Sequence, residues 1–310
     1  MKSHNCTGTA WRCYLIEHNT EYRYAFPVSS ARHLTHLMPV EHQGQKVGQY
    51  CLEIDQPLTE SRQGIDFFGN RYHDFAITTP HTGLKVTVHM EVSVRLPARP
   101  LQSVPWNGQS LARHSFDPED RAGREFALTC APYLADSPLI PAFPEAGQWA
   151  LQRMGAGRQA RPLHEQLLAL TLAMHDEFVF DPEATAVGSP VAEVFRTRRG
   201  VCQDFAHLMI AALRGIGIPA RYVSGYILTR PPAGEERLIG ADATHAWVEA
   251  WCPGHGWLGL DPTNGKTVSA EFVTLARGRD YSDVIPLRGV VVGGGEHTLK
   301  VSVSMIPEGE

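Results

Sequence analysis

The sequence lacks several features that would indicate a class of protein directly. Its 310 residues include only six cysteines, at positions 6, 13, 51, 130, 202 and 252, without a CxxC pair or regular spacing. Cysteines scattered in this way predict neither a disulfide framework nor a cysteine-rich zinc site. In a reducing compartment we expect each of them to be a free thiol.

Long apolar runs and an excess of positive charge are also missing. No stretch approaches the roughly 18 apolar residues of a membrane span, and the start of the sequence has no continuous apolar segment of the signal-peptide kind. The formal net charge of −5 gives no basic field to attract nucleic acid or an acidic membrane. These absences predict a soluble, cytoplasmic protein with no nucleic-acid and no membrane partner.

The pattern of the sequence changes along the chain. β-Branched and aromatic residues in rough alternation predict a β-rich N-terminal domain over residues 1–100. Three prolines mark a linker, and together with a helical segment it occupies 101–160. Residues 161–310 show helical periodicity followed by strand-like runs. We expect them to form an α+β core, with helices packed on an antiparallel sheet, and to include the C-terminal strands.

One cysteine stands at a predicted helix start. The stretch RRGVCQDFAHLMIAALRGIG, residues 198–217, places Cys202 on the apolar face of an amphipathic helix. A free cysteine on such a face is more often a small buried hydrophobe than a nucleophile. Its place in the first turn favours a nucleophile, because unpaired N–H groups and the helix dipole stabilise a thiolate there. The N–H groups, including that of Gln203, can also bind an oxyanion.

A thiolate needs an acid–base partner, and the chain has 15 histidines to choose from. His245 opens the strand-like run HAWVEAWC, and Asp261 closes the next run, GWLGLDPT. If these runs pair as a hairpin through PGHG, both side chains reach the same edge of the sheet, where a carboxylate can orient the imidazole. The alternatives are a partly exposed surface histidine and an aspartate of an Asx turn.

The ordered set Cys202, His245 and Asp261 resembles the bacterial transglutaminase-like proteins, within the papain-like cysteine superfamily. Three blocks carry the resemblance, and the β-rich start, residues 14–39, is similar to the N-terminal domain of the same proteins. The blocks span residues 198–228, 243–265 and 278–305.

The resemblance implies a papain/transglutaminase-like core preceded by a smaller β-rich domain. It implies that Cys202 is the nucleophile, His245 the acid and base, and Asp261 the residue that orients His245, with no cofactor and no metal. An acyl-thioester would form and be resolved by water or by an amine. The calcium-binding insertions and extra β domains of the animal cross-linking enzymes are missing from this sequence. We therefore expect a cysteine peptidase or amidase acting on peptide-like amides.

Two alternatives to that expectation remain open. The first is an acyltransferase of the transglutaminase type, which passes the acyl group to an amine. The second is a non-catalytic binding module that keeps the fold. A metal site built from histidines and cysteines is a weaker interpretation, because the CPGH turn has no second cysteine pair. Its ligands would be Cys202, His207, His245, Cys252 and His255.

Further residues are candidates for the rim of the cleft. Tyr226, Asp242 and Trp257 could line it, although Trp257 is explained most simply by packing. Asp204 and His207 are expected to have a structural role, pairing with each other, with the sheet or with the GRDYSD block at 278–283.

Overall fold

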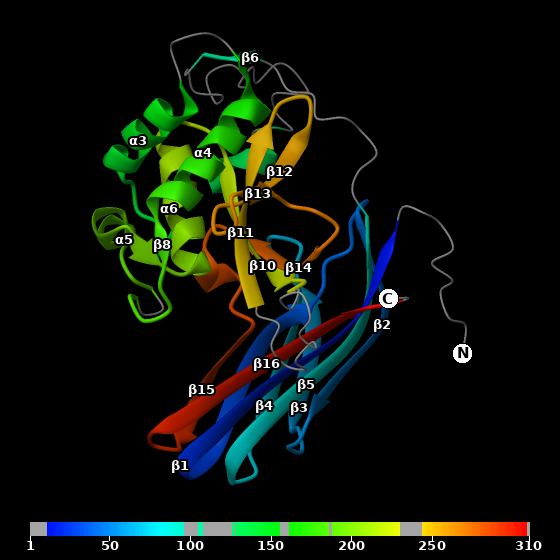
Figure 1. Ribbon diagram of the computed structural model, residues 1–310. Coiled ribbons are helices and arrows are strands. Elements are labelled where there is room, and N and C mark those ends of the chain that lie inside the picture. The colour runs from blue at the N-terminus through cyan, green and yellow to red at the C-terminus, as the bar shows by residue number, and fades with distance from the viewer. Residues whose placement is uncertain are drawn as a thin grey trace, which may run out of the picture.

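The computed structural model describes residues 11–95, 105–107, 126, 128–155, 161–185, 188–229 and 244–308. They form two parts (Figure 1). The N-terminal sheet consists of β1 to β5 with β15 and β16, and the core lobe comprises the described residues between 105 and 284.

The N-terminal sheet is antiparallel and is built around one long strand, β1 (Arg12–Met38). The first half of β1 pairs with β5 and β16, and the second half with β4 and β15. The register shifts between Arg23 and Val28, where the strand bends. The remaining strands are β2 (Gln45–Ile54), β3 (Glu60–Ile65), β4 (Arg71–Ile77), β5 (His81–Val94), β15 (Leu287–Gly293) and β16 (His297–Pro307).

The C-terminal strands therefore belong to a different part of the molecule from the one to which the sequence assigned them. Residues 161–310 were expected to form one unit, whereas β15 and β16 pair with β1 in the N-terminal sheet. They follow β1 as one strand interrupted by Gly293–Gly295, whose positive φ angles permit the bend. Val303 and Met305 of β16 are buried in the same hydrophobic cluster as Tyr14 and Ile16, so burial of apolar surface accounts for this pairing.

The core lobe contains a five-stranded antiparallel sheet in the order β13–β12–β11–β10–β14. Its strands are β10 (Ala220–Ile227), β11 (Thr244–Cys252), β12 (Gly256–Asp261), β13 (Lys266–Thr267) and β14 (Phe272–Gly278). Short strand pairs join β6 (Pro105–Trp106) to β7 (Arg161–Pro162) and β8 (Val179–Phe180) to β9 (Arg199–Gly200). β11 and β12 form the hairpin that the sequence predicted.

The helices of the core lobe gather around α6 (Cys202–Gly215), which packs on β10 and β11 (Figure 1). The others are α3 (Pro144–Met154), α4 (Leu163–Glu177), α5 (Val191–Thr197) and the 3-10 helices η1 (Ala131–Tyr133) and η2 (Tyr281–Asp283). Apolar side chains of α3, α4 and α6 share one hydrophobic core with the sheet. The α+β architecture predicted from the sequence is confirmed. Part of the linker and helical segment expected over residues 101–160 lies outside the described residues.

Two buried amides attach the N-terminal sheet to the edge strand β14. The Gln45 side chain donates to the carbonyl of Thr274 and accepts from its N–H, at 2.7 and 2.8 Å. Asn70 makes the equivalent pair of bonds with the backbone of Arg277, both at 2.7 Å. An edge strand presents unpaired backbone groups, and these amides satisfy them. The position of the N-terminal sheet on the core lobe is thereby set by hydrogen bonds as well as by apolar contact.

Two sequence expectations can be compared with this structure. Cys13 is disulfide-bonded, which corrects the expectation that every cysteine is a free thiol. Cys51, Cys130, Cys202 and Cys252 are free. Within the described residues, no helix is long and apolar enough to cross a membrane.

Candidate active site

Cys202 is the first residue of α6. The helix start is fixed by Asp204, whose carboxylate accepts hydrogen bonds from the Val201 N–H at 2.9 Å and the Thr185 hydroxyl at 2.6 Å. Gly200 leaves room for that carboxylate, because a Cβ there would lie 2.8 Å from its oxygen. Asp204 therefore has a structural role, as expected, but its partners are Val201 and Thr185 and none of those considered from the sequence. It holds Cys202 where the N–H groups of the first turn remain without helical partners.

His245 lies next to Cys202 from a different element of the core lobe. It is the second residue of β11 and is buried. Its Nε2 donates to the Asp261 carboxylate at 2.9 Å, and the ring also shares a hydrogen bond with the Cys202 side chain. Since Nε2 is engaged by Asp261, the nitrogen left for the thiol is Nδ1.

Register explains how Asp261 reaches His245. Val248 pairs with Leu260 across the β11–β12 hairpin, so Asp261 follows at the position beside Trp247. His245 lies two residues further along β11, on the same face as Trp247, and is thus a diagonal neighbour of Asp261. The sequence predicted only that the two side chains reach the same edge of the sheet, and the register shows that they meet there as diagonal neighbours.

Asp261 is itself held in place. One carboxylate oxygen accepts from the N–H groups of Thr263 and Asn264, and the other accepts from the Asn264 side chain at 2.6 Å. Burial raises the pKa of Asp261, but the hydrogen bond and charge of His245 together with the Asn264 bonds outweigh it and lower the pKa. Asn264 was not predicted from the sequence, although its place in DPTNG, three residues after Asp261, is a usable signal.

The surroundings of His245 favour the charged form of its imidazole. Burial lowers the pKa of His245, but the hydrogen bonds and charges of Asp261 and Cys202 outweigh burial and raise the pKa to about 9. An imidazolium beside a thiol favours the thiolate. The three side chains can therefore hold a thiolate–imidazolium pair next to the free N–H groups of a helix start.

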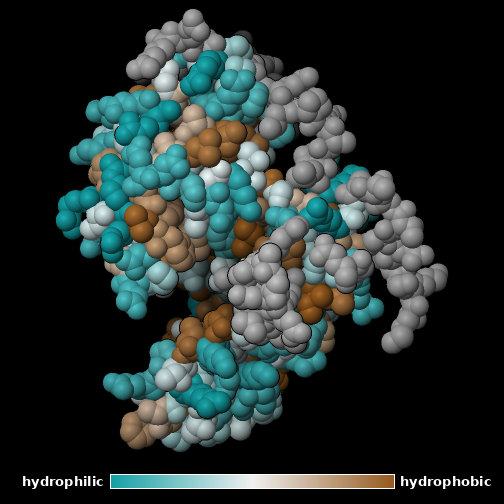
Figure 2. Space-filling model, viewed as in Figure 1, coloured by the Kyte–Doolittle hydropathy of each residue, from teal (hydrophilic) through white to brown (hydrophobic). Residues whose placement is uncertain are grey.

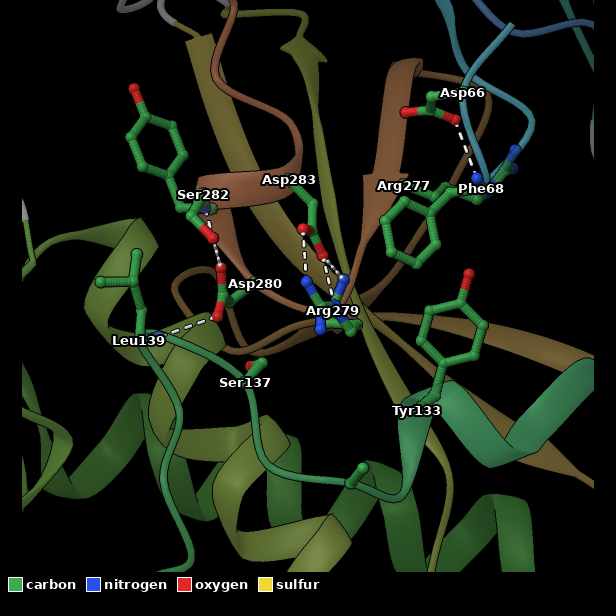
Figure 3. A network of polar contacts seen from close by, with 12 residues as sticks. Asp66, Phe68, Tyr133, Ser137, Leu139, Arg277, Arg279, Asp280, Ser282 and Asp283 are labelled. Atoms are coloured by element: carbon green, nitrogen blue, oxygen red, sulfur yellow. Dashed lines mark hydrogen bonds and ion pairs between the residues drawn. The ribbon is translucent and has the colours of Figure 1, made fainter.

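The GRDYSD block is connected to α6, the helix that begins with Cys202. Arg279 forms an ion pair with Asp283, and Asp280 accepts hydrogen bonds from the N–H groups of Leu139 and Ser282 (Figure 3). His207 accepts a hydrogen bond from the Tyr281 N–H at 3.1 Å, and burial lowers the pKa of this histidine to about 4, so it is neutral. His207 is thus a structural residue that anchors η2 to α6.

The remaining candidates lie away from Cys202 or next to it without a defined contact. Tyr226 is fully buried, and its hydroxyl bonds to His18 of β1 at 2.8 Å. It therefore connects the core lobe to the N-terminal sheet and does not line a cleft. Trp257 lies at the turn end of β12, where Arg221 stacks on its ring at 4.1 Å. Gln203 is partly exposed in the first turn of α6. Asp242 lies outside the described residues.

The proposed metal ligands are not brought together. Cys252, the last residue of β11, is buried in the hydrophobic core. His207 accepts a hydrogen bond from the Tyr281 N–H. Within the part of the chain that the structure describes, no group of three or more histidine, cysteine or acidic side chains is placed to hold a metal ion.

Comparison with known proteins identifies the family. The transglutaminase-like superfamily model matches residues 151–262, and the bacterial transglutaminase-like N-terminal region matches residues 14–93. An uncharacterized protein of Mycobacterium tuberculosis is 37% identical over 306 residues, which cover 95% of this chain and 92% of that protein. The chain therefore belongs to the transglutaminase-like superfamily, as its resemblance predicted.

Two further proteins are similar to parts or to the whole of the chain. A protein-glutamine gamma-glutamyltransferase of Pseudomonas aeruginosa is 39% identical over 113 residues, 34% of this chain and 17% of that protein. The crystal structure of "a Putative Cysteine Protease from Cytophaga hutchinsonii" has a TM-score of 0.73 at 19% identity, and the match covers 97% of this chain and 92% of that one. At this identity the second similarity establishes the fold alone.

Proposed function

We propose that this protein is a cysteine-dependent enzyme that cleaves amide bonds in peptide-like substrates through an acyl-thioester intermediate. The observation that carries the proposal is the position of His245, which bonds to Asp261 on one side and to Cys202 on the other. A nucleophile, a base and a group that orients the base are the components such chemistry requires.

In the proposed reaction the Cys202 thiolate attacks the carbonyl carbon of the amide. A C–S bond forms, and the oxyanion is stabilised by N–H groups at the start of α6. When the tetrahedral intermediate collapses, the C–N bond breaks and His245 gives its proton to the leaving amine. A water molecule, deprotonated by His245, then attacks the thioester. The second collapse releases the acid and restores the thiolate–imidazolium pair.

Transfer of the acyl group to an amine is the second candidate. It is supported by the 39% identity to the gamma-glutamyltransferase of P. aeruginosa, whose matched segment covers 17% of that protein. The two candidates differ only in the acceptor, because the same thioester serves water and amine. Fold membership does not distinguish them.

The test is intact-mass detection of the acyl-enzyme with a library of peptide amides, with Cys202→Ala as the control. We expect a mass increase equal to the acyl group, and its loss in the variant. Products formed with and without an added primary amine separate hydrolysis from transfer. If no mass change depends on Cys202, the protein is not an enzyme of this kind, and the non-catalytic binding module is favoured.

A further inference from the structure

Two aromatic rings lie against the imidazole of His245 in the core lobe. The indole of Trp247, two residues along β11, stacks on the imidazole at an interplanar angle of 29°, with ring centroids 6.3 Å apart. The ring of Phe272, from β14, lies at 6.1 Å and 50°. The indole and the Phe272 ring also meet edge to face, with centroids 5.3 Å apart. The imidazole that bonds to Asp261 and Cys202 is therefore bordered by two rings that the proposed reaction does not use.

The position of Trp247 carries two costs that packing alone does not explain. Its indole N–H is buried and has no hydrogen-bond partner among the described residues, which is unfavourable in a protein interior. The ring also needs a glycine at 225, because a Cβ there would lie 2.4 Å from it. Gly225 pairs with His245 in the register of β10 and β11, so the indole extends over the position opposite His245. A leucine would fill the core without an unpaired N–H, and such local costs are typical of functional positions.

The two rings are closed to a substrate. Apolar residues reach the surface where the core lobe meets the N-terminal sheet (Figure 2), but Trp247 and Phe272 are only 1% and 2% exposed. They form a small buried cluster with Val223, against which Ile227 and Val268 pack. Any effect of the rings on the reaction must therefore act through the imidazole that they border.

Charged groups surround His245 and the two rings from several elements. The thiol and the carboxylate that bond to the imidazole come from α6 and β12. Lys266 of β13 places its ammonium group 5.2 Å from the centroid of the Phe272 ring, and the Glu271 carboxylate offsets part of that charge at 4.0 Å. The faces of aromatic rings carry partial negative charge. They favour the charged imidazole, whereas Lys266 and the exclusion of water disfavour it.

We propose that Trp247 and Phe272 are positioning residues, which fix the plane of the His245 ring and stabilise its charged form through their π faces. The inference rests on the proposed function, in which His245 gives a proton to the leaving amine. An aromatic face attracts a cation within about 6 Å, and the attraction is larger where water is excluded. Two rings in contact with each other also leave the imidazole little freedom to rotate, so its Nδ1 stays directed toward Cys202.

The test measures the charge of His245 separately from turnover. The full chain carrying Cys202→Ala is labelled with isotopic histidine and titrated by NMR, and the His245 signal is assigned by its absence in His245→Gln. A tryptophan fluorinated on its benzene ring, inserted at position 247 alone, keeps the shape of the indole but withdraws its π electrons. We expect it to lower the pKa of His245 by about 0.5 to 1, because the imidazolium loses part of its attraction. Phe272→Leu, which keeps apolar bulk beside the imidazole, should lower this pKa as well.

The matched control is Phe75→Leu. Phe75 is a buried phenylalanine of β4 whose ring stacks on another buried histidine, His33, with centroids 5.3 Å apart. Its replacement should leave the pKa of His245 unchanged. In protein that retains Cys202, the fluorinated tryptophan should move the alkaline limb of kcat/KM to lower pH. Thermal unfolding checks each variant, and Phe272→Met replaces Phe272→Leu if that variant does not fold.

An unchanged pKa of His245 with the fluorinated tryptophan would overturn the inference, because the rings would then only pack. A fall of the same size in Phe75→Leu would overturn it too, since the effect would not be local. If the pKa falls as expected but wild-type protein forms no Cys202-dependent acyl-enzyme, the proposed function fails and the stabilisation of the imidazolium by the two rings stands.

Discussion

Two ionic clusters lie four residues apart on β11, and they differ in what surrounds the charge. His245 at the start of the strand contacts Asp261 and Cys202. Glu249, further along, accepts from Arg221 at 2.6 Å and from Arg277 at 3.0 Å. One strand thus carries both a candidate reactive group and a buried ion network.

The Glu249 cluster is closed. Burial raises the pKa of Glu249, but the guanidinium groups of Arg221 on β10 and Arg277 on β14 outweigh it and lower the pKa to about 2. Both carboxylate oxygens are bonded, and Arg221 also stacks on Trp257. Every partner is a permanent part of the sheet. Such a network holds β10, β11 and β14 together and leaves no group to react.

The His245 cluster is open, in the sense that one of its partners can react with a substrate. Asp261 is a permanent partner, whereas the second partner is a thiol, which changes charge when it forms a bond with a substrate. One of the two groups that stabilise the positive charge of His245, the Cys202 thiol, can therefore react. This difference distinguishes a structural ion network from a candidate catalytic one, and variants of the two clusters test it.

The largest effect is expected at the open cluster. His245→Ala should reduce formation of the Cys202 acyl-enzyme by about 1000-fold, because both the imidazolium that stabilises the thiolate and the proton donor are lost. The fold should be retained, since Asp261 keeps its bonds to Thr263 and Asn264. Stopped-flow or intact-mass kinetics measure the rate. A loss smaller than tenfold would show that His245 is not the acid and base.

The closed cluster should respond in stability instead. Glu249→Gln removes the charge between Arg221 and Arg277 and leaves them buried side by side, so we expect a loss of about 3 kcal/mol of unfolding free energy. The pKa of Glu249 is lowered, so its stabilisation is present above its unfolded value and is lost as the pH falls toward 2. Urea unfolding at neutral pH measures the loss.

The matched control for that variant is Glu193→Gln on α5, an exposed glutamate. It should change the unfolding free energy by less than about 0.5 kcal/mol. Acylation per folded molecule should stay within a few-fold of wild type in both variants. A large loss of acylation in Glu249→Gln without a loss of stability would remove the distinction between the clusters.

Much of the candidate site could be predicted because its geometry is local. Glycine before Cys202 and apolar periodicity after it define a helix start, and alternation defines the β11–β12 hairpin that carries His245 and Asp261. The roles of these three residues, like the cytoplasmic location and the choice of acceptor, stay predictions.

What could not be predicted depends on long-range contacts. Nothing in the pattern of β15 and β16 says that they pair with β1, more than 250 residues earlier in the chain. Alternation in β10 gives the face of Tyr226 but not the N-terminal sheet that covers it. The alternative that Trp257 lines a cleft could not be decided from the sequence, because it depends on which end of the hairpin faces α6. Sequence periodicity defines elements and faces, whereas partners require the assembled fold.

A third variant tests the difference between the two clusters most directly, because it changes the charge beside His245 without removing the imidazole. Asp261→Asn keeps the shape of the side chain but removes the anion that raises the pKa of His245 to about 9. A raised pKa keeps the imidazolium present below about pH 9 and lets it deprotonate above. We therefore expect the alkaline limb of kcat/KM to move to lower pH by one to two units, with a fall of about 100-fold at pH 8.

Asp74→Asn, which affects an exposed ion pair with Arg32 on the N-terminal sheet, is the control and should leave the pH profile unchanged. Iodoacetamide labelling of Cys202 across the same pH range reports the thiolate directly and should shift in the same direction. If the profile of Asp261→Asn matched that of wild type while its rate fell, Asp261 would act by position alone. The positive charge of His245 would then be stabilised by Cys202 rather than by Asp261. The difference from the Glu249 cluster would depend on Cys202 alone.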